Sequence, residues 1–192
     1  MTKNYTLKNM TLAAMFLALG LVLPMLTGQI PQIGNMLLPM HIPVLLCGLI
    51  CGWPYGLAIG FITPLLRGVL FGMPPLFPIG ISMAFELATY GAVVGVLYAC
   101  ARWKCVVSLY RSMLIAMVAG RLVWGAVRVV LTGVAGQAFT WQMFMAGALL
   151  NAIPGIVLQL IFIPAMMVAL DRTGLVRFTK KAGADEHGGA RQ

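Results

Sequence analysis

Long apolar segments, separated by short polar or Gly/Pro-rich turns, make up most of the chain. A helix needs roughly 20 apolar residues to cross a bilayer, so about six spans fit into 192 residues. The segments lack the short alternation of a membrane strand, and backbone in lipid must satisfy its own hydrogen bonds. The pattern therefore predicts an all-α membrane protein, a six-transmembrane-helix bundle. The predicted spans are residues 7–26, 36–53, 55–71, 78–101, 112–131 and 141–170.

Composition supports the same class. Hydrophobic residues form 61% of the chain and charged residues 9%, against roughly 25% charged in soluble proteins. With so little polar sequence left over, we expect a single membrane domain over residues 1–174. A polar cytoplasmic tail, which we expect to be disordered, follows over residues 175–192.

Basic residues cluster at the segment ends that six spans would place on one side of the membrane. These are Lys3 and Lys8, the 102–111 connection, and residues 172–181, whereas the three opposite loops carry no charge. Short cytoplasmic loops are enriched in Lys and Arg, so both termini are predicted to be cytoplasmic. The net charge of +9 then reflects orientation in the lipid bilayer and headgroup contacts, and no nucleic-acid partner is expected.

Small residues repeat at helical spacing in the first three predicted spans. Ala14 and Ala18 lie one turn apart, as do Gly48 and Gly52, and then Gly56 and Gly60. This spacing allows helices to approach closely in a membrane. The four cysteines match no zinc motif, so neither a metal nor another cofactor is expected.

Charged side chains inside the apolar segments are the strongest functional signal, because they are costly in lipid and usually serve a function. Arg67 and Glu86 flank the loop FGMPPLFP, which would bring them to similar depth as one wall of a polar pocket. Arg121 and Arg128 share one face of a later helix with Trp124 between them. The predicted substrate-binding residues are Arg67, Glu86, Arg128, Arg121, Asn151, His41, Tyr90 and Trp124, with Phe85 as further apolar surface.

A purely structural interpretation competes with this pocket. Glu86 would then neutralise Arg67 or Arg121 in a buried pair, His41 would bond at a helix end, and Asn151 would join helices. Three arginines against one glutamate nevertheless leave excess positive charge, and unpaired buried charge is costly. An anionic ligand resolves this imbalance, since a guanidinium suits a carboxylate or phosphate.

Catalytic motifs are missing from the sequence: it has no P-loop, no HExxH and no GxSxG. We therefore expect no enzyme but a solute-binding membrane protein, which would need a partner to hydrolyse ATP for uphill transport. The alternatives are a self-sufficient, proton-coupled secondary transporter of a small organic anion that uses Glu86, and a structural protein without ligand.

Over residues 7–172 the chain resembles the substrate-binding S components of energy-coupling factor (ECF) vitamin transporters. The resemblance rests on its length, the Ala14 and Ala18 motif, and the block PMHIPVLLCGLICGWPYGLAIGFITPLLRGVLFGMPPLFP followed by MAFELATYG. It implies a multi-pass protein of the bacterial plasma membrane that captures a vitamin outside. The vitamin is then delivered to a transmembrane coupling protein with two ATPase subunits. It also implies docking through Ala14 and Ala18 and a ligand lid from residues 29–35, 73–77 and 134–139.

The pantothenate and folate branches of that family are the most similar. Excess arginine favours a vitamin with a carboxylate, so we expect pantothenate first and folate second. Cobalamin stays a third candidate, since wide uncharged loops suit a larger ligand.

Overall fold

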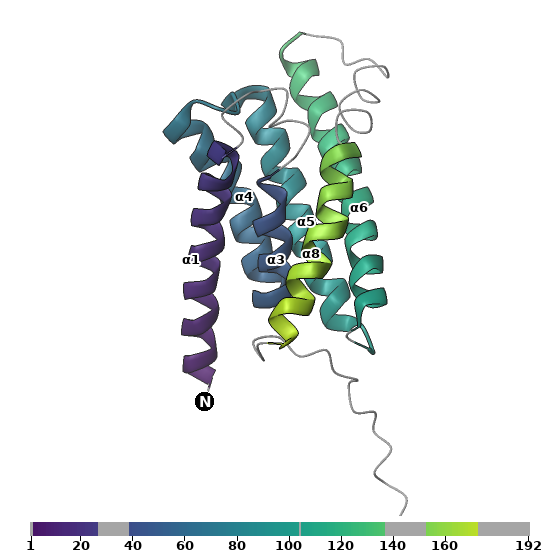
Figure 1. The fold of residues 1–192 in the computed structure, drawn as a ribbon. Coiled ribbons are helices and arrows are strands. Elements are labelled where there is room, and N and C mark those ends of the chain that lie inside the picture. Colours follow the sequence, from purple (N-terminus) through teal and green to yellow (C-terminus); the bar gives the residue numbers. More distant parts are fainter. Residues whose placement is uncertain (1, 27–38, 104, 137–152, 173–192) are drawn as a thin grey trace, which may run out of the picture.

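The computed structural model describes residues 2–26, 39–103, 105–136 and 153–172. Within these residues the elements are six α-helices and one short π-helical turn, which form an elongated bundle (Figure 1). They are α1 (Thr2–Leu26), α3 (His41–Cys51), α4 (Trp53–Phe71), η1 (Leu76–Gly80), α5 (Ile81–Cys100), α6 (Val106–Val134) and α8 (Ile153–Arg172).

Five of the described helices are long and apolar enough to cross a membrane, whereas α3 has only 11 residues. The all-α membrane fold is thus confirmed, and the sixth span stays a prediction. The start of α1, the α5–α6 connection and the end of α8 lie at one end of the bundle, and η1 lies at the other (Figure 1). This arrangement agrees with the charge pattern, although the side on which the termini lie stays a prediction.

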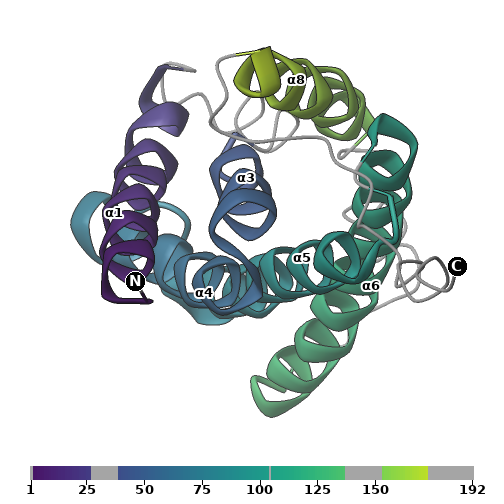
Figure 2. The ribbon, with the colours of Figure 1, turned by 90° about the horizontal axis from the view of Figure 1, so that it is seen from below.

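Helix α3 forms the axis of the bundle. Ten of its 11 residues are buried, and it packs against α1, α4, α5 and α8, which surround it when viewed along the bundle (Figure 2). A helix that is apolar on every side is suited to burial, and here the four neighbouring helices cover it. Its first residue, His41, is consequently placed in the interior.

Glycines allow α3, α4 and α5 to pack backbone against backbone. A Cβ atom at Gly48, Gly56 or Gly60 would overlap backbone atoms of a neighbouring helix, mainly of α5 around Gly91 and Leu87. Close packing at these three positions is confirmed. Gly52, however, has φ of 97° and turns the chain between α3 and α4, so it does not serve as a packing glycine.

Several helix boundaries differ from the prediction. Helix α6 covers 106–134 instead of 112–131, because the apolar residues from Val106 continue the helix through Arg111. At 29 residues it is about 43 Å long, which exceeds the roughly 30 Å hydrocarbon core, so an upright α6 would extend into the headgroup regions. The first part of the predicted 141–170 span lies outside the described residues, as do the lid segment 29–35 and the second half of the lid segment 134–139.

Candidate functional site

A buried polar cluster centres on Glu86 of α5. Its carboxylate Oε1 lies 2.9 Å from Nη1 of Arg121 on α6 and accepts a hydrogen bond from the Tyr90 hydroxyl at 3.0 Å. Nε2 of His41 lies 3.7 Å from the same oxygen. The Glu86 side chain is only 2% exposed, so α3, α5 and α6 meet around one desolvated carboxylate.

Local sequence explains how these groups meet. Glu86 and Tyr90 are one turn apart on α5, so they share a face. Gly120 precedes Arg121, and a Cβ atom there would overlap the Tyr90 ring. The missing side chain lets α6 approach α5 closely enough for Arg121 to reach the carboxylate. The signal that could have revealed this role is the spacing of Ser112, Ala116 and Gly120, three small residues one turn apart on α6.

His41 contributes unused hydrogen-bonding capacity to the cluster. Neither of its ring nitrogens has a hydrogen-bond partner among the described residues, and its ring lies 5.2 Å from that of Tyr90 between centroids. No side chain caps the start of α3 at Met40. The positive end of a helix dipole therefore adds to the attraction for an anion beside His41.

Arg121 is only partly satisfied by Glu86. Its Nε and Nη2 atoms are buried and have no hydrogen-bond partner in the part of the chain that the structure describes. A buried donor without a partner costs free energy, about 1–3 kcal/mol and more when the group is charged. Arg121 can thus neutralise Glu86 and still donate to a further acceptor.

Arg128 lies two turns beyond Arg121 on the same face of α6. Its guanidinium carbon is 5.9 Å from the centroid of the Trp124 ring, and its buried Nε has no hydrogen-bond partner among the described residues. The predicted common face of Arg121, Trp124 and Arg128 is thus present. Arg128 presents a half-buried cation that no described carboxylate neutralises.

Arg67 lies apart from the Glu86 cluster. Its Nη1 donates to the backbone oxygen of Leu21 on α1 at 3.2 Å, and its guanidinium carbon is 5.8 Å from the Phe71 ring. Arg67 and Glu86 were predicted to form one wall of a pocket, but they form no ion pair with each other. Arg121 is the arginine that pairs with Glu86. At 6% exposure, Arg67 ties the end of α4 to the end of α1.

Two further residues complete the comparison with the sequence predictions. Asn151 lies outside the described residues. Gln159 was not predicted, yet it is only 1% exposed on α8, and its Nε2 has no partner within the described chain. A lone amide in the apolar 153–170 segment was the available signal.

The charges of this region do not cancel. Glu86 and Arg121 neutralise each other, whereas Arg67 and Arg128 find no carboxylate within the described residues. No three described His, Cys, Asp or Glu side chains gather as metal ligands. The chemistry available is therefore recognition of an anion by guanidinium groups beside aromatic rings.

Comparison with known families gives one match. The sequence model of the family described as "ECF transporter, substrate-specific component" matches residues 8–167. Comparisons with curated proteins and with solved structures give no match. The family match covers every element described above except the last residues of α8 and the first residues of α1.

Proposed function

Since the chain belongs to the family of ECF transporter substrate-specific components, we propose that it captures an anionic vitamin from outside the cell, pantothenate first and folate second. Members of this family are transporter components, not enzymes, and they are multi-pass proteins of the cell membrane. Such components bind small-molecule substrates and work with an ECF module.

The surplus of positive charge around the buried cluster carries this proposal. Arg128 has a buried Nε without a partner among the described residues, and Arg121 keeps two unused donors beside its ion pair. A carboxylate accepts two parallel N–H bonds from a guanidinium and neutralises its charge. Trp124 beside Arg128 offers apolar surface to the rest of the ligand.

The position of Arg67 favours pantothenate over folate. Pantothenate carries one carboxylate, and Arg128 alone suffices to bind it. Folate carries two, and Arg67, the other arginine that no described carboxylate neutralises, would bind the second one although its Nη1 already donates to the Leu21 oxygen. An Arg67→Gln variant should therefore bind pantothenate normally, and it should lose affinity if folate is the natural ligand.

Helix α1 supports the proposed docking on a transmembrane coupling protein that carries two ATPase subunits. Ala14 and Ala18 are both exposed on α1, and α1 is the least buried of the five long helices. A face of small residues lets a partner helix approach closely in lipid. We assign this face to the coupling protein.

A thermal-shift panel of vitamins on the purified chain tests the proposal. Pantothenate or folate should raise the melting temperature of the unchanged protein by mass action. Arg128→Ala should abolish that shift, and Arg172→Ala, at the opposite end of the bundle, should keep it. A panel without any shift contradicts the binding role.

The competing secondary transporter requires Glu86 to take up and release protons. Arg121 and Tyr90 both bind the Glu86 carboxylate, so protonation would cost the ion pair. The chain alone in liposomes should show no proton-driven uptake. Uptake under a proton gradient without ATP or partners would favour the secondary transporter.

A further inference from the structure

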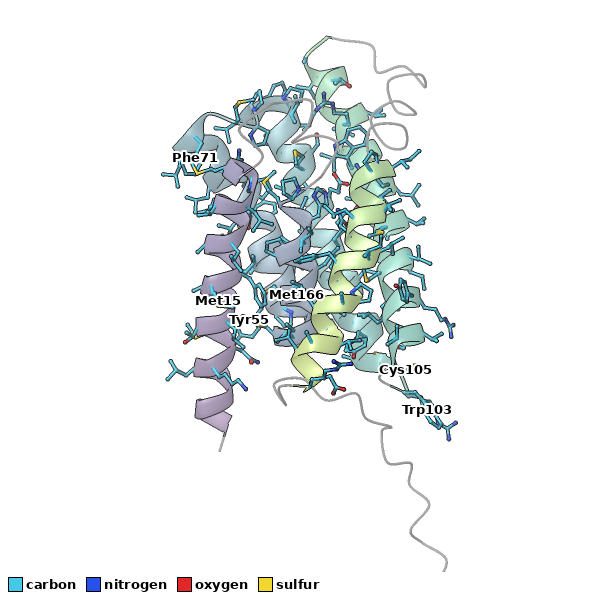
Figure 3. The ribbon with its side chains drawn as sticks, viewed as in Figure 1. Met15, Tyr55, Phe71, Trp103, Cys105 and Met166 are labelled. Atoms are coloured by element: carbon cyan, nitrogen blue, oxygen red, sulfur yellow. The ribbon has the colours of Figure 1, made fainter. Side chains whose placement is uncertain are left out.

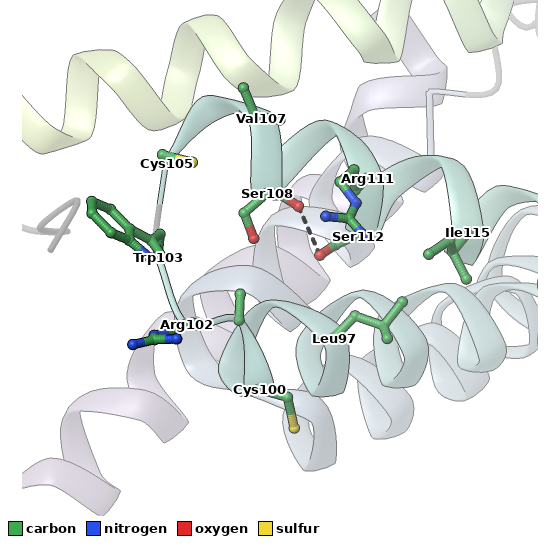
Figure 4. Close-up of a pocket in the computed structure, with 11 residues that line it drawn as sticks. Leu97, Cys100, Arg102, Trp103, Cys105, Val107, Ser108, Arg111, Ser112 and Ile115 are labelled. Atoms are coloured by element: carbon green, nitrogen blue, oxygen red, sulfur yellow. Dashed lines mark hydrogen bonds between the residues drawn. The ribbon is translucent and has the colours of Figure 1, made fainter. Parts of the chain in front are cut away.

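A pocket with two arginines at its rim lies at the opposite end of the bundle from the Glu86 cluster. Its volume is about 330 Å³, and its walls come from the end of α5, the α5–α6 connection and the first turns of α6 (Figure 4). Trp103 and Cys105 lie at this end, whereas Phe71 lies at the other (Figure 3). None of the residues assigned to the vitamin or to the coupling protein lines this pocket.

Two arginines give this pocket its charge. Arg102 comes from the connection and Arg111 from α6, and both are exposed. No described carboxylate pairs with either of them. The pocket therefore attracts an anion that the described chain does not itself supply.

The remaining walls are largely apolar and open outward. Val107 is 67% exposed and Ile115 50%, and Leu97 lines the same pocket. Arg111 lies five residues into α6, or about 7 Å along the helix axis, which is a depth typical of lipid headgroups. Trp103 is 53% exposed beside it, as expected for an aromatic side chain at a membrane interface.

We propose that this pocket binds the headgroup of an anionic phospholipid, with Arg102 and Arg111 on the phosphate and an acyl chain that runs into the bilayer along Leu97 and Ile115. Basic pockets between membrane helices are suited to such headgroups. The apolar side chains that continue from the arginines favour a lipid over free phosphate, which has no acyl chain to cover them. Lipid binding here depends neither on the identity of the vitamin nor on which leaflet surrounds the end of the bundle that holds the α5–α6 connection.

Native mass spectrometry of the full chain, released from nanodiscs of phosphatidylglycerol and phosphatidylcholine with identical acyl chains, tests the proposal. The unchanged protein should retain phosphatidylglycerol in preference to phosphatidylcholine. Replacing both arginines, Arg102→Gln with Arg111→Gln, should lower this preference by about tenfold or more. Because both side chains are exposed, the variant should keep the melting temperature of the unchanged protein.

Lys8→Gln is the charge control, since Lys8 is an exposed basic residue at the same end of the bundle but on α1. It should keep the preference within about twofold, because Lys8 lies outside the pocket. Equal retention of the two lipids by the unchanged protein would overturn the proposal. An equal loss in Lys8→Gln, or displacement of the lipid by millimolar inorganic phosphate, would overturn it as well.

Discussion

Arg121 and Glu86 form an ion pair of 2.9 Å that joins α6 to α5 inside the bundle. The sequence left open whether Glu86 would neutralise Arg67 or Arg121, and the structure places Arg121 there. The pair has a structural role, yet Arg121 keeps Nε and Nη2 without partners among the described residues. The same arginine can thus stabilise the fold and face a ligand.

Glu86→Gln should destabilise the protein strongly. The change leaves the Arg121 charge buried without its counter-charge. Removing one partner of a buried ion pair lowers the free energy of unfolding by about 3–5 kcal/mol. Thermal unfolding in detergent, followed by tryptophan fluorescence, measures this loss.

The double variant Glu86→Gln with Arg121→Gln is the control for this measurement. It removes both charges, so its loss of stability should be smaller than the sum of the two single losses. Additive losses would mean that the two side chains do not interact in the folded protein.

Arg128→Ala should weaken vitamin binding by well over tenfold and leave the protein folded. Its guanidinium pairs with no described carboxylate, so the fold loses little when it is removed. Titration calorimetry with the vitamin that the panel identifies measures the effect. Unchanged affinity would remove Arg128 from the site.

Gly120→Ala should destabilise the protein by about 1–3 kcal/mol, because the new methyl group would press on the Tyr90 ring. Gly133→Ala is a matched control in the same helix, since no atom of the described residues beyond its own helix neighbours lies within 4 Å of its Cβ position. It should be neutral or slightly stabilising through helix propensity. Equal effects of the two changes in thermal unfolding would contradict the proposed contact between α6 and Tyr90.

Much of the helical framework could be predicted, because apolar length fixes which segments form helices in lipid. Boundaries were less predictable. The prediction placed Arg111 in a connection, whereas it lies within α6, where a long side chain can carry its charge outward from an apolar helix. A charge near a membrane interface therefore does not mark a helix end.

The site could be predicted only as a set of candidates. His41, Glu86, Tyr90 and Arg121 were predicted as members of one site, and the structure brings their side chains together. Which arginine meets Glu86 depends on how each helix is rotated about its axis. Close contacts such as the one at Gly120 set that rotation, and they involve residues far apart in the sequence.

Ala14→Trp should spare vitamin binding yet abolish uptake by the complete transporter. Ala14 is exposed on α1, away from the Glu86 cluster, so a large side chain would obstruct a partner helix without disturbing the site. Val118→Trp is the control, because Val118 is 62% exposed on α6, a different face of the bundle. Uptake of labelled vitamin into cells, with binding measured in parallel on purified protein, separates the two effects. Normal uptake by Ala14→Trp, or equal loss in Val118→Trp, would mean that the coupling protein docks elsewhere.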